Sequence, residues 1–206
     1  LSQVNGYCEC ATAKSMDLMM LRMTHAMVSQ NAAEGGKPAS TPSDDDKDDD
    51  DDEVIDGIPS RFLGPLLADL VCHEVGHTLG LRHNFRGSSI YTFDEINSDE
   101  LRGKKAFASS IMDYVPINFV IENGEVAGDY AMIDIGPYDY WAIEFGYGPD
   151  SEVKKVLSRS TEPQLTYGTD EDTSGPDPRD RRYDFSSNPL DYANFQMDLA
   201  PFHLAR

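Results

Sequence analysis

The amino-acid sequence predicts an α+β fold built around one long helix. Apolar residues recur at helical spacing from Leu66 to Leu79, and a glycine follows at once, which indicates a helix that ends there. The segments 118–122 and 125–130 have strand character and flank an Asn-Gly pair, which predicts a β-hairpin. From 160 to 189 the chain is dense in Asp, Pro, Gly and Ser, so we expect a loop-rich C-terminal part.

The remaining elements are predicted from shorter patterns. A strand is expected over 7–12, and a helix rich in Met and Leu over 15–30. Pro59 and Pro65 suit the first turn of the long helix, because proline lacks an N–H that this turn leaves unbonded. The aromatic segment 139–147 is expected to form a short helix.

Length and charge limit the classes of protein to which this chain can belong. It has 206 residues, 39% of them apolar, and a net charge of −20. We predict a single domain over 1–206. The start at Leu1 instead of Met suggests a mature product or a piece cut from a longer chain. The negative charge excludes nucleic acid and anionic membranes as partners held by bulk charge. No membrane span is predicted, and no signal peptide starts the chain.

Much of the charge lies in one tract. Between Ser43 and Glu53 there are eight Asp, one Glu and one Lys, and such a block repels itself and buries no apolar surface. We therefore predict an acidic disordered loop over 35–56 inside the domain. A calcium-collecting loop is the alternative, although the tract lacks the turn glycine and terminal Glu of a preorganised calcium site.

The segment from 73 to 84, HEVGHTLGLRHN, carries the chemistry. His73 and His77 are four residues apart, so on a helix their rings share one face. Glu74 is one step around from that face, where it can reach water without being a ligand. Gly80 can take the left-handed conformation that ends a helix, and this turn lets His83 return to the same metal.

Three neutral nitrogen ligands with a free fourth position are typical of a catalytic zinc site. The pattern HExxHxxGxxH is also specific, since roughly one shuffled sequence in a hundred thousand of this composition would contain it. We therefore predict one catalytic Zn²⁺ and hydrolysis by activated water, with Glu74 as the general base.

This motif resembles the long zinc-binding consensus of the metzincin metallopeptidases, and SIMDY at 110–114 resembles their Met-turn. The resemblance implies that Met112 forms an apolar floor beneath the histidines and that Tyr114 approaches the metal or the reacting carbonyl. More narrowly, GLRHNF, SIMDYVP, YDYWAIEFGYGP and YGTDEDTSGPDPR are similar to the bacterial extracytoplasmic Met-zincin group, over roughly residues 6–200.

The resemblance implies a metzincin-like zinc-protease catalytic domain that cleaves peptide bonds in protein or peptide substrates outside the cytoplasm. Only 72 residues precede His73, fewer than the sheet and helix at the start of that fold occupy, so we expect a truncated N-terminal sheet.

Three alternatives stay open at this point. The chain could be a zinc-stabilised binding module that has lost its activity, which the intact Glu74 argues against. The segment 94–99, DEINSD, resembles the downstream motif of gluzincins, which would make Glu95 the third ligand instead of His83. Calcium could bind the carboxylates of 170–180, but their spacing is not that of a calcium loop.

The cysteines give little functional information. Cys8, Cys10 and Cys72 are too few and too oddly numbered for a disulfide framework, and Cys8 and Cys10 are too close for an easy mutual bridge. We expect Cys72 to be a buried, inert thiol.

Overall fold

The computed structural model describes residues 9–33, 53–55, 58–118, 120–122 and 125–204. Within these residues the α-helices are α1 (Glu9–Ala33), α2 (Ser60–Thr78), α3 (Phe93–Ile96), α4 (Pro137–Tyr147), α5 (Val153–Leu157) and α6 (Pro189–Leu204). Short 3-10 helices lie within the loop regions: η2 (Gly87–Ile90), η3 (Pro163–Leu165) and η4 (Asp172–Ser174). Two antiparallel strand pairs complete the fold, β1 (Val54–Ile55) with β2 (Ile58–Pro59) and β3 (Val120–Glu122) with β4 (Glu125–Ala127).

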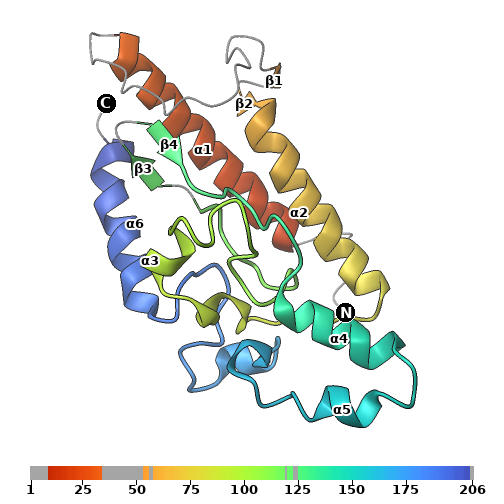
Figure 1. Ribbon diagram of the computed structural model, residues 1–206. Coiled ribbons are helices and arrows are strands. Elements are labelled where there is room, and N and C mark those ends of the chain that lie inside the picture. The colour runs from red at the N-terminus through yellow and green to blue at the C-terminus, as the bar shows by residue number, and fades with distance from the viewer. Residues whose placement is uncertain (1–8, 34–52, 56–57, 119, 123–124, 205–206) are drawn as a thin grey trace.

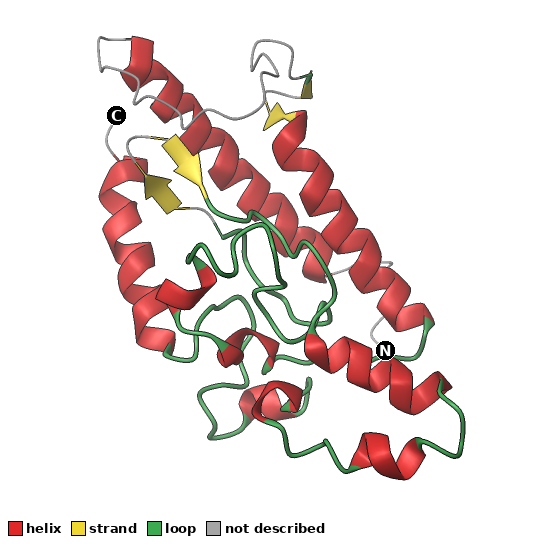
Figure 2. Ribbon diagram, viewed as in Figure 1, coloured by secondary structure: helices red, strands yellow, loops and turns green. Residues whose placement is uncertain are grey.

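The long helices α1 and α2 lie side by side and run in opposite directions (Figure 1). Helix α6 and the β3–β4 hairpin also contact α1, while α4 and α5 lie near the end of α2. Most of the chain between α2 and α6 is loop, as Figure 2 shows. The mixture of helices with a small sheet agrees with the predicted α+β class. No helix among the described residues is long and apolar enough to cross a membrane.

Several predicted elements are confirmed with shifted bounds. The hairpin is present with shorter strands than predicted, and its Asn-Gly turn lies outside the described residues. The helix predicted over 139–147 begins two residues earlier, at Pro137, whose missing N–H costs nothing in a first turn. Helix α2 begins at Ser60, so Pro65 lies inside it and not in its first turn.

The strand predicted over 7–12 is wrong, since Glu9 to Thr12 form the first turn of α1. Cys10 in this turn is buried against Phe85 and Tyr114, so tertiary packing extends the helix beyond the segment 15–30 that the sequence predicts. The acidic loop predicted over 35–56 lies outside the described residues except for 53–55.

Three helices, α3, α5 and α6, have no counterpart in the sequence prediction. The first two span four and five residues, too few to show a helical period. Helix α6 is longer, and its Tyr192 and Phe195 pack against the two larger apolar clusters of the core. Contacts that are distant in sequence therefore stabilise helices that local pattern does not reveal.

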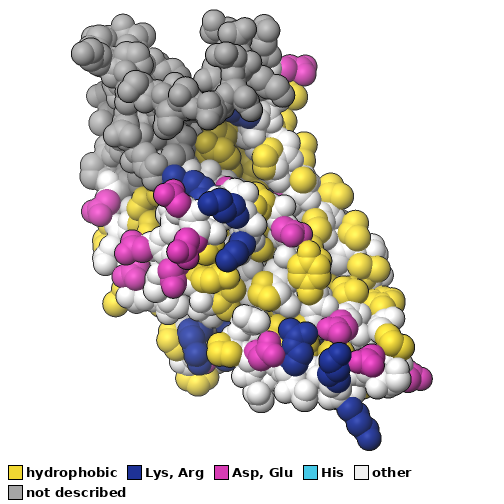
Figure 3. Space-filling model, viewed as in Figure 1, with side chains coloured by type: hydrophobic (Ala, Val, Ile, Leu, Met, Phe, Trp, Pro, Cys, Tyr) yellow, Lys and Arg dark blue, Asp and Glu magenta, His cyan; other side chains and the backbone are white. Residues whose placement is uncertain are grey.

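Helix α2 has apolar side chains on both its buried and its exposed face. The buried face recurs every three or four residues and contains Phe62, Leu66, Asp69, His73 and Gly76. The opposite row is exposed, and Figure 3 shows hydrophobic side chains along this edge of the molecule: Leu67, Val71, Val75 and Leu79. The apolar pattern predicts the helix, but it does not show that His73, the first histidine of the motif, faces inward.

A buried ion pair joins the two long helices. Lys14 Nζ of α1 lies 2.7 Å from an Asp69 carboxylate oxygen of α2, and each side chain is only 6% exposed. The same ammonium donates to the carbonyl oxygen of Val115, at 3.1 Å. Asp17, one turn further along α1, accepts the N–H of Ile117 at 3.0 Å. Helix α1 thus holds α2 and the segment 115–117 in one arrangement.

We expect Lys14→Met to lower the free energy of unfolding by about 3–5 kcal/mol, because it leaves the Asp69 carboxylate buried without its cation. The double variant Lys14→Met/Asp69→Leu should recover most of that loss, since it removes both charges. Urea unfolding of the three proteins tests this. A double variant that is no more stable than the single variant would contradict the assignment.

Candidate metal centre

The chain turns back sharply after α2. Gly80 has φ +86°, a left-handed conformation that glycine adopts without strain. Its N–H donates to the His77 carbonyl at 3.0 Å, and the N–H of Leu81 donates to the Gly76 carbonyl at 3.1 Å. These two bonds form a Schellman motif, which satisfies the last carbonyls of the helix. The turn brings His83 back beside the helix, as the position of the glycine predicts.

Each histidine ring is fixed through its Nδ1 atom. His73 Nδ1 donates to the Ile111 carbonyl oxygen at 2.8 Å, and His77 Nδ1 donates to that of Leu81 at 3.0 Å. His83 Nδ1 lies 3.0 and 3.1 Å from the two carboxylate oxygens of Asp170. Because every partner is an oxygen that only accepts, each Nδ1 carries a proton and each neutral ring keeps a lone pair at Nε2.

The three Nε2 atoms converge. One nitrogen from each ring lies within 4.8 Å of the others, and His77 Nε2 is 3.2 Å from His83 Nε2. Two ligands on a tetrahedral zinc would be about 3.3 Å apart. His73 is 2% exposed, and its Nε2 has no hydrogen-bond partner among the described residues. A divalent cation fits this donor set, because it supplies the partner that these lone pairs need.

The electrostatics favour neutral rings. Burial lowers the pKa of His73 to about 4, and the neighbouring His77 and His83 act in the same direction, against the Ile111 carbonyl and the Glu74 carboxylate. Burial also lowers the pKa of His83, although the Asp170 carboxylate opposes it. Neutral imidazole is the form that binds metal.

Met112 packs against the helix that carries His73 and His77. Its side chain is fully buried, and its Sδ is packed so closely against Gly76 of α2 that a Cβ at position 76 would overlap it. Gly76 is the residue just before His77, so this contact places the methionine directly under the metal-binding turn of the helix. The sequence analysis assigned no role to Gly76.

The Met-turn is held by a buried carboxylate that the sequence analysis missed. Asp139 of α4 accepts the Ser110 hydroxyl at 2.6 Å and the backbone N–H groups of Ile111 and Gly136 at 2.7 and 2.8 Å. The Ile111 carbonyl on the same turn then fixes His73. Asp139 therefore links α4 to the first ligand, and only its position after a Gly-Pro pair, as the N3 residue of a helix, hints at this in the sequence.

Tyr114 points at the third ligand. Its hydroxyl lies 2.9 Å from His83 Nε2, and its ring centroid is 5.4 Å from that of His73. The hydroxyl thus stands at the point where the histidines converge. The side chain is 6% exposed, so packing against Phe85 and Cys10 fixes its direction.

The two candidate glutamates occupy different places. Glu74 is exposed on α2, immediately after His73. Glu95 is outside the histidine group: its carboxylate accepts the N–H and hydroxyl of Thr92 at 2.8 and 2.9 Å in a capping box at the start of α3. The alternative ligand set containing Glu95 therefore does not form.

The acidic segment after Asp170 is neutralised by arginines. Arg86 donates to Asp180 and Asp177, both at 2.7 Å, and Arg179 also donates to Asp177. Within the described residues, the three histidines are the one group that can hold a metal ion. The structure gives no support to a calcium site over 170–180.

The structure describes two of the cysteines, and neither forms a disulfide. Cys10 is buried, and Cys72 is half-buried. Cys72 is thus less buried than predicted, although burial and nearby carboxylates raise its pKa and so favour the protonated thiol. Cys8 lies outside the described residues.

The long helix ends in a glycine turn, and beside it three histidines form a group that could hold a metal ion. The chain belongs to the Met-zincin family, whose model matches residues 56–204 and so includes every predicted site residue. No curated protein and no solved structure matches the chain. The family predicted from the sequence is confirmed.

A buried pair of carboxyls lies behind the Met-turn. Asp113 accepts the N–H groups of Ser88 and Tyr114 at 2.8 and 2.7 Å, and the Ser88 hydroxyl donates to Asp184 at 3.1 Å. Burial, together with the charge of Asp184, raises the pKa of Asp113 well above its usual range. Burial also raises the pKa of Asp184 to about 6.

The raised pKa of Asp184 makes the fold less stable at neutral pH. An unfolded Asp loses its proton near pH 3.8 and the folded one near pH 6, so the free energy of unfolding falls through this window, by about 3 kcal/mol. Asp184→Asn removes that loss and keeps an oxygen for Ser88. We expect an unchanged Tm at pH 4 and a higher Tm at pH 7. The control is Asp150→Asn, the same substitution at an exposed residue, which should not reproduce the gain at pH 7. A lower Tm for Asp184→Asn at pH 7 would rule the explanation out.

Proposed function

We propose that this chain is the catalytic domain of a zinc-dependent endopeptidase and that His73, His77 and His83 hold the metal. The observation that carries the proposal is the common orientation of the three rings: each Nδ1 lies on an oxygen that only accepts, and one nitrogen from each ring lies within 4.8 Å of the others. Family membership supports zinc as the ion. When bound, Zn²⁺ supplies a Lewis acid that acidifies water and polarises a carbonyl group.

The protein's own groups handle the protons. The Glu74 carboxylate is the general base that takes a proton from the attacking water, and it later delivers this proton to the nitrogen of the leaving amine. Its exposure on α2 supports this role, since water and a peptide can both reach it. The Tyr114 hydroxyl, directed at the point where the histidines converge, donates a hydrogen bond to the oxygen that gains negative charge.

Gly80 and Met112 support the site without taking part in the reaction. Gly80 allows the turn that returns His83, and Met112 forms the floor beneath the helix. The proposal includes protein or peptide substrates, a single catalytic domain over 1–206 and an extracytoplasmic location, which the family resemblance implies.

We expect Glu74→Gln to bind one zinc per chain and to lose hydrolysis of an unfolded protein substrate by about 10²–10⁴-fold, because the amide cannot accept the proton. His77→Ala should lose both zinc and hydrolysis, since one of three nitrogens is gone. Metal analysis and cleavage assays, each with and without a chelator, provide the measurements.

Glu95→Gln is the matched control, because it makes the same chemical change at a glutamate committed to a helix cap. It should keep both zinc and activity. Full hydrolytic activity in Glu74→Gln would contradict the assignment of Glu74 as the general base. Zinc binding with no chelator-sensitive cleavage by the parent protein would favour the zinc-stabilised binding module instead.

A further inference from the structure

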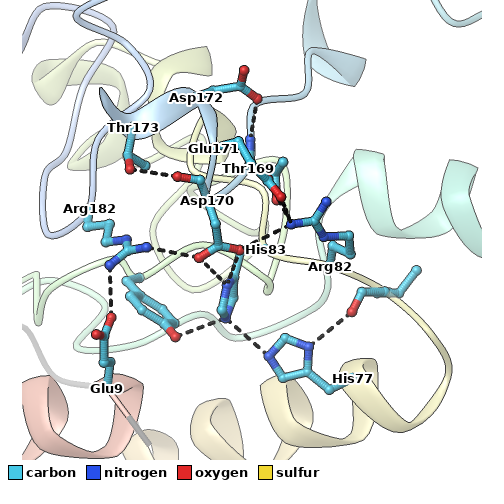
Figure 4. Close-up of polar contacts among 12 residues, drawn as sticks. Glu9, His77, Arg82, His83, Thr169, Asp170, Glu171, Asp172, Thr173 and Arg182 are labelled. Carbon is cyan, nitrogen blue, oxygen red and sulfur yellow. Dashed lines mark hydrogen bonds and ion pairs between the residues drawn. The ribbon is translucent and has the colours of Figure 1, made fainter. Parts of the chain in front are cut away.

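The third histidine differs from the other two in the partner behind its ring. The partners of His73 and His77 are neutral backbone carbonyls. The partner of His83 is instead the carboxylate of Asp170, as Figure 4 shows. A charged acceptor forms a stronger hydrogen bond with imidazole N–H and makes the ring a better electron donor at Nε2. His83 also lies beyond the end of α2, so no helix backbone fixes its direction.

Asp170 is itself held in place by charge. Arg182 Nη2 donates to Asp170 Oδ1 at 2.9 Å, and Nη1 of the same guanidinium lies 2.9 Å from Glu9 Oε2 at the start of α1. Arg82 approaches the other side of the Asp170 carboxylate at 3.7 Å. The carboxylate therefore has arginines on two sides and the His83 ring on a third.

Aromatic packing couples the same groups. The Arg182 guanidinium lies over the Phe85 ring, 4.8 Å from its centroid. His83 stacks on the same Phe85 ring, at a centroid distance of 5.0 Å and an interplanar angle of 29°. Arg182 thus contacts both the carboxylate that binds His83 and the ring that packs on it.

The backbone fixes the distance between Asp170 and His83. The N–H of Phe85 donates to the Gly168 carbonyl at 2.7 Å, while the Asn84 side chain bonds the carbonyl of Thr166 and the N–H of Gly168 at 3.1 and 3.2 Å. Asn84 is fully buried. These hydrogen bonds join the two residues after His83 to the residues just before Asp170. They therefore hold the Asp170 carboxylate next to the His83 ring.

We propose that Asp170 is the positioning residue for the third ligand: it fixes His83 with the proton on Nδ1 and Nε2 toward the metal, and Arg182 holds Asp170 for that task. The inference rests on the proposed function only in taking His83 as a zinc ligand. Asp170 touches neither metal nor substrate, and it acts through His83.

Zinc affinity measured by competition with a colorimetric chelator tests this without any assay of activity. We expect Asp170→Ala to bind zinc about 10–100-fold more weakly than the parent. Asp170→Asn should show a smaller loss, about three- to tenfold, because its amide oxygen accepts the same N–H without the charge. The visible absorption of the Co²⁺-loaded protein should change in Asp170→Ala, since the ligand geometry changes.

Glu171→Gln is the matched control, because it removes one negative charge from the adjacent residue, whose carboxylate binds Arg82 and no histidine. It should keep its zinc affinity within about twofold of the parent. Circular dichroism of the metal-free proteins checks that each variant is folded. If Asp170→Ala does not fold, Asp170→Asn decides the question.

The outcomes separate the two proposals. A folded Asp170→Ala that binds zinc as tightly as the parent, with an unchanged Co²⁺ spectrum, overturns the positioning role and leaves the proposed function standing. If Asp170→Ala is unfolded, an Asp170→Asn variant with the zinc affinity of the parent overturns the positioning role in its place. A parent protein that binds no zinc overturns both.

Discussion

The metal centre depends on one constraint, the hydrogen bond at Nδ1 of each histidine. The three acceptors come from three parts of the chain: the Leu81 carbonyl from the turn after α2, the Ile111 carbonyl from the Met-turn, and the Asp170 carboxylate from the C-terminal loops. Each acceptor selects the tautomer with a lone pair at Nε2 and aims it at a common point. The site is therefore organised by the protein, and all three segments must be in place together.

Around the site, carboxylate side chains accept the backbone hydrogen bonds that helices and sheets accept in other folds. The segments around the site are mostly loop, so their N–H groups lack the ladders that helices and sheets provide. Asp139 accepts the N–H of Ile111 in the Met-turn, and Asp113 accepts those of Ser88 and Tyr114. Asp17 accepts the N–H of Ile117. Together with the Lys14–Asp69 ion pair, these bonds make loops rigid enough to hold ligands.

The net charge of −20 consequently has several separate origins. Part of it belongs to the acidic tract, and part is taken up by buried structural carboxylates. In the segment from 170 to 180 the carboxylates are matched by arginines that also connect distant parts of the chain, as Arg182 connects Asp170 to Glu9. The excess acid is thus no measure of what the protein binds, and the chemistry is set locally around the three histidines.

The sequence by itself predicted the three histidines that converge, the glycine turn, the buried methionine and the family, because each depends on spacing within a few residues or on a motif. It also predicted α2, α4 and the hairpin. It did not predict α6, the helical start of α1, or the contacts of Asp139 and Asp170, and it left a calcium site open as an alternative where arginines bind carboxylates. Those features depend on contacts between residues far apart in the chain, 87 positions in the case of His83 and Asp170. Only the tertiary structure decides these features. The sequence contains many carboxylates that could accept the N–H of His83, and the fold brings that of Asp170 to the ring.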